Sequence, residues 1–434
     1  MKRTLIQQLP TLVGQDVRIA GFAQVIRDQK RMQFVILRDH TGTAQLFHEK
    51  GEEGDALKAA ISSLTLESAI VATGKVVANP SVKLGGIEIV LTTLEVVGPA
   101  ETPIPLSLDS SLDLRLDWRA LSIRWPENAL IFRVQTTMEH AMREFWRQNG
   151  FVEIHSPKLM GTASESGAEL FQLDYFGVKA SLAQSPQFYK QMAMAAGLDR
   201  IFEIGPVFRA NPSFTSRHDT EFTSIDVEIS WVESHEDVMQ LEEALLHHAL
   251  SRVAEVHGAE IKALLGVEIV VPSLPFPRIS LSEARRILAE RGHVIAHKED
   301  LDPPGERGLA EYIREQHGHE FVFVTDYPIE VRPFYHRRHE SNPALTRSFD
   351  LLWKGLEVTT GAQREHRVDV LSQQALEKKI PLESISHYID FFRYGCPPHG
   401  GFGLGLTRLL MILLDRKNVR EVTYLYRGPK RLVP

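Results

Sequence analysis

The sequence contains a single cysteine, Cys396, and no long apolar run. One cysteine cannot form an internal disulfide, and the chain has no cysteine cluster of the kind that holds zinc. No apolar stretch approaches the roughly 20 residues needed to span a bilayer. The opening MKRTLIQQLP also lacks the apolar segment of a signal peptide. We therefore expect a cytoplasmic protein without a membrane partner.

The chain has no marked excess of one charge, because 49 Lys and Arg stand against 56 Asp and Glu, a net charge of −7. Such a protein does not coat nucleic acid by bulk charge. Residues 1–50 differ, since they hold eight basic and four acidic side chains. This local excess predicts a phosphate-binding face, with an ordinary solvated surface as the alternative. The length of 434 residues indicates two or three domains.

Residues 1–100 have the pattern of an all-β domain. Short runs rich in β-branched and aromatic residues alternate with turn-forming groups, and a helix is expected near residues 55–64. The runs are DVRIAGFAQVI, MQFVILRD, GTAQLFHE, AIVATGKVV and GIEIVLTTLEVVG. Five strands with a helix between the third and fourth fit the five-stranded barrel of an OB-fold, an architecture that often binds oligonucleotides.

A Pro-rich stretch, GPAETPIPLSLDS, follows the predicted barrel. We expect residues 101–128 to form a linker or hinge. Residues 129–434 alternate amphipathic helices with apolar strands, which predicts an α+β domain built around an antiparallel sheet. The sequence therefore predicts a small barrel, a linker and a larger α+β domain.

The segment FRANPSFTSRHDTEFTSIDVEISW carries charges at regular places. One strand ends in Arg209, a polar loop holds Arg217 and His218, and the returning strand has Asp226 and Glu228 on one face. Arginine forks suit phosphate or carboxylate groups. A basic loop of this kind can also be plain surface.

Two later segments add a metal ligand set and a glycine run. SFDLLWKGLEVTTGAQREH offers Asp350, Glu357 and Thr360, hard oxygen ligands that suit Mg²⁺ bound to substrate phosphates. PPHGGFGLGLTRLLMILLDR has four glycines within residues 400–405, followed by a helix that starts near Arg408. It is not a P-loop, and no strand is evident directly before it. Together the three segments predict a nucleotide site.

These segments resemble the signature motifs of class II aminoacyl-tRNA synthetases, and most closely the aspartyl-tRNA synthetases of the compact archaeal type. EFWRQNGFVEIHSPKL resembles the first motif, which forms the homodimer interface in that family. FRANPSFTSRH with EFTSIDVEISW resembles the second motif, and GGFGLGLTRLL the third. The resemblance covers nearly the whole chain. It implies that ATP and L-aspartate form aspartyl-adenylate with Mg²⁺, and that the aspartyl group is then transferred to tRNA(Asp).

The resemblance also assigns roles to residues at the ATP end. Arg209 and Arg408 are the catalytic pair, with Arg209 on the α-phosphate and Arg408 on the far side of the triphosphate. Arg217 and His218 reach the γ-phosphate, and Phe222 stacks on adenine. Glu357 and Thr360 hold Mg²⁺, with Asp350 as a weaker candidate. The remaining implied ATP contacts are Ala210, Asn211, Asp219, Gly405, Leu406 and Thr407.

The aspartate site rests on the segments GTASESGAELF, LAQSPQFYKQ and GAQREH. By resemblance, Glu165 and Asp226 receive the amino group, while Lys190 and Arg364 clamp the side-chain carboxylate. The further implied aspartate contacts are Ser185, Gln187, Arg209 and Thr360. Two buried cations favour aspartate, because the uncharged amide of asparagine leaves them poorly compensated. Asparaginyl-tRNA synthetases are not expected to have this lysine.

In the barrel, Phe34 and Gln45 match the family residues that read the middle anticodon base. A strand phenylalanine taken alone is more typical of a core. Gln24, Arg27 and Lys83 complete the expected anticodon contacts. Strict archaeal members have Trp where Gln24 stands, which favours a relaxed enzyme that also charges tRNA(Asn), whereas Lys83 favours a strict one. We favour the relaxed form, for which an amidotransferase partner stays an open question.

One departure from the family concerns Asn211, which stands where a glutamate usually contacts adenine. We expect altered ATP contacts there and retained activity. The alternative to a ligase is a synthetase-like paralogue that does not charge tRNA. Such paralogues often lose the anticodon barrel or the arginine of the third motif, and this chain keeps both.

Overall fold

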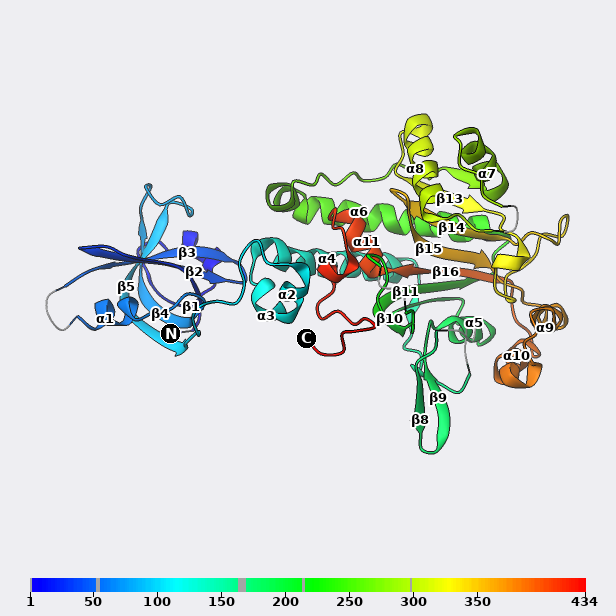
Figure 1. The fold of residues 1–434 in the computed structure, drawn as a ribbon, viewed down its shortest axis with the longest axis horizontal. Coiled ribbons are helices and arrows are strands. Elements are labelled where there is room, and N and C mark those ends of the chain that lie inside the picture. The colour runs from blue at the N-terminus through cyan, green and yellow to red at the C-terminus, as the bar shows by residue number, and fades with distance from the viewer. Residues whose placement is uncertain (1, 52–54, 163–168, 213–214, 297–298) are drawn as a thin grey trace. The chain divides into compact units, whose positions relative to one another are not determined.

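The computed structural model describes residues 2–51, 55–162, 169–212, 215–296 and 299–434. The chain forms two compact units, Met1–Ser111 and Leu112–Pro434 (Figure 1). Within the described residues, no helix is both long and apolar enough to cross a membrane. Each unit is considered separately below.

The first unit is a closed five-stranded barrel with the strand order β1-β2-β3-β5-β4. This is the OB-fold that the sequence predicts. Its strands are β1 (Asp16–Asp28), β2 (Met32–Asp39), β3 (Gly42–Glu49), β4 (Ala69–Ala78) and β5 (Ile87–Gly98). A 3₁₀ turn, η1 (Ile6–Thr11), precedes them, and helix α1 (Ala56–Ser62) lies where a helix is expected.

Alternation along each strand decides which side chains fill the barrel. On β2, Val35 and Leu37 are fully buried in the barrel core, whereas Phe34 and Ile36, which alternate with them, are only half-buried. Strand β1 departs from this regularity, because its pairing with β2 shifts between Ala23 and Val25. The shift is a β-bulge, which re-aims side chains locally.

The second unit is built on an eight-stranded sheet with the order β12-β13-β14-β15-β16-β11-β10-β6. Its six central strands are antiparallel, as predicted, and only the outermost pairs β12–β13 and β6–β10 are parallel. The bounds are β6 (Val152–Glu153), β10 (Arg200–Phe208), β11 (Glu221–Ser230), β12 (Arg278–Ser280), β13 (Phe321–Thr325), β14 (Ser348–Trp353), β15 (Leu356–Gln363) and β16 (His399–Gly405).

A second, small sheet has the order β7-β9-β8. It consists of β7 (Leu159–Met160), β8 (Gln172–Tyr175) and β9 (Val178–Leu182). Strands β8 and β9 form a hairpin that projects from the rest of this unit (Figure 1).

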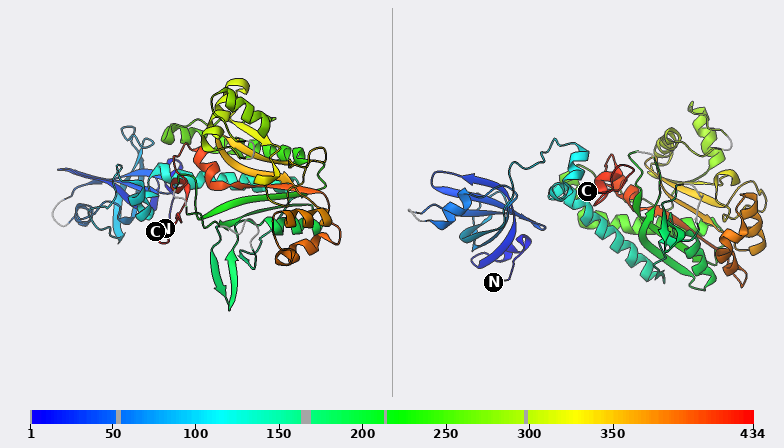
Figure 2. Two further views of the ribbon diagram at one scale, coloured as in Figure 1. Left: turned by 45° about the vertical axis from the view of Figure 1, so that its right-hand side comes forward. Right: turned by 60° about the horizontal axis from the view of Figure 1, so that its bottom comes forward.

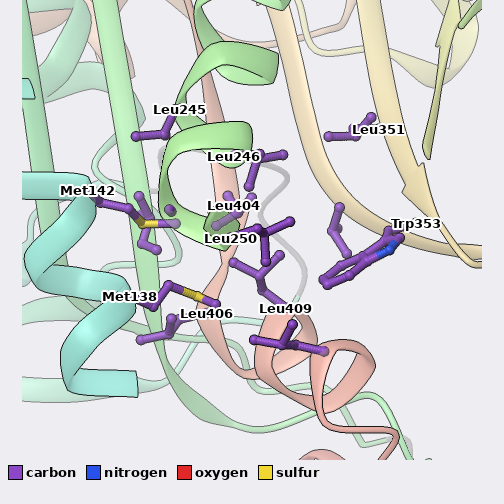
Figure 3. Packing of buried hydrophobic residues seen from close by; sticks show 14 of the residues in the cluster. Met138, Met142, Leu245, Leu246, Leu250, Leu351, Trp353, Leu404, Leu406 and Leu409 are labelled. Carbon is purple, nitrogen blue, oxygen red and sulfur yellow. The ribbon is translucent and has the colours of Figure 1, made fainter. Parts of the chain in front are cut away.

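Two long helices, α4 (Pro126–Gln148) and α6 (His235–Leu265), lie side by side, and α6 packs on β15 and β16 (Figure 2). Met138 and Met142 of α4 meet Leu245, Leu246 and Leu250 of α6 in the main core (Figure 3). The other helices are α2 (Leu112–Asp117), α3 (Arg119–Ser122), α5 (Gln187–Ala195), α7 (Leu281–Glu290), α8 (Pro303–His317), α9 (Val368–Glu377), α10 (Ser386–Phe392), α11 (Leu406–Leu413) and α12 (Val419–Val422), with 3₁₀ turns η2 (Ile329–Val331) and η3 (Leu382–Ile385).

Two sequence-based interpretations look different in the structure. Residues 112–122, which we expected within the linker, form α2 and α3 and group with the second unit. Arg119 of α3 is the reason, because it is buried and donates hydrogen bonds to three carbonyl groups between residues 421 and 424. The glycine run, for which we saw no preceding strand, itself forms the central strand β16.

Candidate active site and anticodon-binding face

A cavity of about 370 Å³ lies over the central strands β11, β15 and β16 of the second unit. It brings together most of the residues that the sequence predicts for ATP and aspartate. These are Ser185, Gln187, Lys190, Arg209, Asn211, Arg217, His218, Asp219, Phe222, Asp226, Glu357, Thr360, Arg364, Gly405, Thr407 and Arg408. Ala210, Leu406 and Asp350 do not line it, and Glu165 lies outside the described residues.

The floor of the cavity holds a buried network of opposite charges. Lys190 Nζ donates to Asp226 Oδ1 at 3.1 Å and lies 3.5 Å from Glu228 Oε2. Arg364 Nε donates to Glu228 Oε1 at 2.9 Å. All four side chains are almost fully buried. Burial by itself would raise the pKa of Glu228, but Arg364 and Lys190 hold it below its ordinary value.

His336 borders the same network from the loop after η2. Arg364 Nη1 lies 3.1 Å from His336 Nε2, and because a guanidinium only donates, this ring nitrogen accepts. Burial, reinforced by Arg364 and Arg332, lowers the pKa of His336 well below its usual value. The neutral ring then carries its proton on Nδ1, a buried atom for which the described residues show no hydrogen-bond partner.

The glycines of β16 make room for these carboxylates. Asp226 is paired with Gly403 and Glu228 with Gly401 across the β11–β16 ladder. A Cβ at Gly401 would lie 2.0 Å from Val227 O and 2.3 Å from Glu228 Oε2. A Cβ at Gly403 would lie 3.1 Å from Asp226 Oδ1. The glycine run is thus required by close packing against the charged floor.

The other end of the cavity carries the cations predicted for the triphosphate. The Arg209 guanidinium lies 5.5 Å from the centre of the Phe222 ring, a cation–π arrangement. Arg217 Nη1 donates to Glu306 Oε2 of α8 at 3.0 Å. Arg408 Nη1 donates to the Glu357 carbonyl at 3.0 Å and lies 3.8 Å from its carboxylate.

Two titrating groups lie beside these arginines. Burial lowers the pKa of His218 to about 4, with Arg408, Arg217 and Arg209 adding to the effect. His218 is therefore neutral near pH 7. Burial raises the pKa of Asp219 to about 7, although Thr407 and Thr423 oppose this. Near pH 7 the positive charge at this end therefore comes from the arginines, with His218 neutral and Asp219 partly protonated.

The proposed magnesium ligands are partly brought together. Thr360 Oγ1 donates to Glu357 Oε1 at 3.3 Å, so that one carboxylate and one hydroxyl face the cavity. Burial, followed by the nearby Asp350, raises the pKa of Glu357. Asp350 itself is buried and forms an ion pair with Arg332. The described residues contain no cluster of three or more His, Cys, Asp or Glu side chains suited to a metal.

This donor set fits Mg²⁺, which takes oxygen ligands and commonly relies on one or two carboxylates plus substrate phosphates. Glu357 and Thr360 supply oxygen atoms directly beside the arginines that would hold the phosphates. Asp350 belongs to this group less directly, because Arg332 already neutralises it.

In the first unit, the predicted anticodon residues lie on the outside of the barrel. Phe34 is absent from the barrel core cluster and packs beside Phe47, with ring centres 5.5 Å apart. The core interpretation of Phe34 is therefore wrong. Gln45 lies on β3 two residues before Phe47, and it donates from Nε2 to Glu88 Oε2 at 2.8 Å. Arg27 pairs across the strands with Phe34 and is exposed.

Gln24 and Lys83, which favour the relaxed and the strict form respectively, lie in different parts of the first unit's sequence and differ in exposure. Gln24 occupies the β-bulge of β1 and is half-buried. Lys83 is exposed in the β4–β5 connection. In the same connection, Asn79 Nδ2 donates to Glu88 Oε1 at 2.8 Å, so Glu88 holds the amides of both Asn79 and Gln45.

Two protein families match the chain in the places that this geometry suggests. The tRNA synthetases class II (D, K and N) match residues 111–427, and the OB-fold nucleic acid binding domain matches residues 17–97. The chain belongs to the class II aminoacyl-tRNA synthetases. In this synthetase, the larger unit therefore carries the catalytic family and the barrel the nucleic-acid-binding family.

Individual relatives support the same placement. The aspartate–tRNA(Asp) ligase of Pyrococcus abyssi is 44% identical over 98% of this chain and 97% of its own length. The aspartate–tRNA(Asp/Asn) ligase of Aeropyrum pernix is 43% identical over 99% and 98%. Among solved structures, the asparaginyl-tRNA synthetase of Pyrococcus horikoshii with asparaginyl-adenylate has a TM-score of 0.92 at 32% identity, covering 100% of both chains. The aspartyl-tRNA synthetase of Entamoeba histolytica has a TM-score of 0.88 at 31% identity, covering 100% of this chain and 93% of that one.

Sequence reasoning missed several residues of the site. Arg332, Tyr335 and His336 line the cavity, and their only signal is the polar cluster in EVRPFYHRR. Glu228 was noted on the strand face without a role, although it bridges the two cations. Glu306, which binds Arg217, gives no sequence signal because it is one acidic residue among several in its helix.

Proposed function

We propose that this synthetase is an aspartate–tRNA ligase, which activates L-aspartate with ATP and transfers it to tRNA(Asp). The observation that carries the proposal is the pair of buried cations, Lys190 and Arg364, at the floor of a cavity whose other end holds Arg209, Arg217 and Arg408. The floor suits a small acidic side chain, and the arginines suit a triphosphate.

The buried floor explains how aspartate would be chosen over asparagine. Asp226 and Glu228 already balance the charges of Lys190 and Arg364, so charge by itself does not decide the choice. Lys and Arg side chains can only donate hydrogen bonds. A carboxylate accepts from all of them, whereas the amide of asparagine would leave an N–H₂ group facing donors, at a cost.

In the activation step, the aspartate α-carboxylate attacks the α-phosphorus of ATP in line and pyrophosphate leaves. No protein nucleophile is needed, so the side chains act by orientation and charge. Arg209 would steady the α-phosphate, and Phe222 beside it, which lines the cavity, would stack on adenine. Arg408, Arg217 and His218 would hold the departing phosphates.

A magnesium ion fits this site through Glu357 and Thr360. When bound, it would supply positive charge to the triphosphate. Asp350, whose charge is balanced by Arg332, would lie near this site without binding the ion directly.

In the transfer step, the terminal ribose hydroxyl of the tRNA would attack the carbonyl carbon of the aspartyl-adenylate, which forms the aspartyl ester and releases AMP. The outer face of the barrel would recognise the anticodon through Phe34 stacking and through hydrogen bonds from Gln45, as single-stranded bases are commonly read. Gln24 on the β-bulge, Arg27 and Lys83 extend this face.

Whether tRNA(Asn) is also charged is the finer question, and we favour the relaxed enzyme. Relatives named for one tRNA and for two are almost equally similar to this chain, at 44% and 43% identity. The support therefore comes from Gln24, which stands where strict archaeal members have Trp. A relaxed enzyme would need a later amidation step for its tRNA(Asn) product.

We also propose a homodimer that works in the cytoplasm. The short edge strands β6 and β7 expose large apolar side chains, Val152 and Leu159, each at 46%. Such exposure around a short edge strand is typical of a covered surface. Light scattering coupled to gel filtration would give about twice the 49.0 kDa chain mass for a dimer. The single cysteine suits a reducing compartment.

The experiment that tests the function is charging of two separate transcripts, tRNA(Asp) and tRNA(Asn), with labelled aspartate, ATP and Mg²⁺. Charging of both at similar efficiency would support the relaxed ligase. Charging of tRNA(Asp) alone would show that the enzyme is strict, and Gln24 would then no longer indicate a relaxed enzyme. If neither transcript is charged, the paralogue alternative is correct. Asparagine as the labelled amino acid is the matched control.

A further inference from the structure

The contact between Arg217 and Glu306 joins the cavity to a part of the fold that the proposed chemistry does not otherwise use. Arg217 lies in the loop between β10 and β11, and Glu306 lies 89 positions later in the first turns of α8. The Glu306 residue is only 6% exposed, and its carboxylate accepts from Arg217 Nη1 at 3.0 Å.

The backbone that carries Glu306 is closely packed. Helix α8 begins with Asp302, whose side chain accepts from the Gly305 N–H at 2.9 Å and caps the first turn. A Cβ at Gly305 would lie 2.8 Å from Ile295, so this turn is closely packed against its neighbours. The position of Glu306 is therefore set by a packed helix end.

The loop that carries Arg217 has weaker anchors around this residue. The Arg217 carbonyl accepts from Arg408 Nε at a long 3.4 Å, and the carbonyl of Ser216 accepts from the Val419 N–H at 2.9 Å. Both anchors hold the backbone only. In the described part of the chain, Glu306 is the one ion-pair partner shown for the Arg217 side chain.

We propose that Glu306 is a positioning residue for ATP, which holds the Arg217 guanidinium at the place where the end of the triphosphate will bind. This inference rests on the proposed function and adds a residue to it. The ion pair uses one amino group of Arg217. The guanidinium has five N–H donors, so its other edge can meet a phosphate while Glu306 keeps its own contact.

Holding the arginine in advance reduces the side-chain freedom that is lost when ATP binds. The opposite arrangement, in which Glu306 competes with the phosphate for Arg217, would need the carboxylate to move away on binding. The close packing of the α8 N-terminus argues against such a movement. The two arrangements predict opposite changes in ATP affinity when the carboxylate is removed.

The test measures Mg·ATP binding by titration calorimetry and aspartate-dependent ATP–pyrophosphate exchange for wild type, Glu306→Gln, Arg217→Ala and the double variant. Because burial raises the pKa of Glu306 to about 7, the measurements are made at pH 8, where its carboxylate is mostly ionised. We expect Glu306→Gln to raise Kd and KM for ATP about tenfold, the scale of one charge-assisted hydrogen bond, with KM for aspartate changed less than about twofold. In the Arg217→Ala background, the same substitution should have no further effect. Glu311→Gln, an exposed change on the same helix, is the matched control.

Tighter ATP binding by Glu306→Gln would overturn the proposal in favour of competition. An unchanged ATP affinity, or an equal loss in the Arg217→Ala background, would also overturn it. Thermal unfolding of each variant separates these results from a general loss of folding. If the wild type binds ATP but shows no aspartate-dependent exchange, the proposed function fails, while the ATP affinities still decide the role of Glu306.

Discussion

Arg364 and Glu228 form a buried ion pair, with Nε of the arginine 2.9 Å from Oε1 of the glutamate and both side chains at most 2% exposed. Removing one partner of such a pair leaves an uncompensated buried charge. This lowers stability far more than replacing both partners by apolar residues. We therefore expect the specificity of the cavity floor to depend on the whole group of charges that meets at Glu228.

Lys190→Met should abolish efficient use of aspartate, because it removes a donor and leaves Asp226 and Glu228 with one cation. We expect KM for aspartate to rise about 100-fold in the exchange assay, the scale of a lost partner in a buried charge pair. ATP affinity should stay within about twofold, since Lys190 lies at the opposite end of the cavity from Arg217 and Arg408.

Lys179→Met, on the exposed hairpin strand β9, provides the matched control and should behave as wild type. If Lys190→Met instead changed ATP affinity and left KM for aspartate unchanged, the placement of the amino acid on this floor would be wrong. Thermal unfolding would show whether the variant remains folded.

Arg209→Ala should lower kcat for ATP–pyrophosphate exchange by about 100- to 1,000-fold, the usual effect of removing one group that stabilises developing charge. The reason is its place over Phe222 at the centre of the cavity. Arg393→Ala, on an exposed arginine paired only with nearby Asp390, is the control. A full rate in Arg209→Ala would remove this residue from the chemistry.

Glu88→Gln should weaken the choice of the middle anticodon base. That base is uracil for both aspartate and asparagine codons, and it offers an N–H donor where cytosine offers an acceptor. Glu88 accepts only, so it draws the Gln45 amide N–H₂ toward itself and leaves the oxygen for the base. A glutamine at position 88 can donate as well as accept, so the Gln45 amide could rotate by 180° and present its N–H₂ group to the base.

The measurement compares kcat/KM for tRNA(Asp) transcripts with uracil and with cytosine at this position. We expect the preference for uracil to fall about tenfold, the scale of one good base contact. Glu95→Gln, exposed on the same strand β5, should keep the preference. An unchanged ratio for Glu88→Gln would show that the orientation of Gln45 is set elsewhere.

Glu242→Gln should stabilise the second unit, and increasingly so as the pH rises. Burial raises the pKa of Glu242 to about 8, so the folded state keeps a proton that the unfolded state loses near the ordinary glutamate pKa of 4.5. The stability contributed by this proton is complete below pH 4.5 and is lost as the pH rises through 8. A glutamine carries no such dependence.

The expected advantage of Glu242→Gln is small at pH 5 and on the order of 4 kcal/mol at pH 8. Urea unfolding of both proteins across this range measures it. Glu255→Gln, on the exposed side of the same helix α6, should show no comparable trend. An advantage that stayed constant with pH would mean that Glu242 is charged in the folded protein.

The sequence by itself determined the elements whose pattern is local. The bounds of β2 and β3 follow from their apolar alternation, and the two-residue spacing of Asp226 and Glu228 places both on one face of β11. The residue type and the motif setting of Arg209 and Arg408 also predicted groups that bind phosphate.

Only the tertiary structure decided how these residues are paired. Glu306 meets Arg217 across 89 positions, and Gly401 stands opposite Glu228 because of the β11–β16 register. Phe34 lies on the outer face because Val35 beside it takes the core position. Strand register and helix packing arise from the sum of many weak contacts over the whole unit, so no short stretch of sequence contains them.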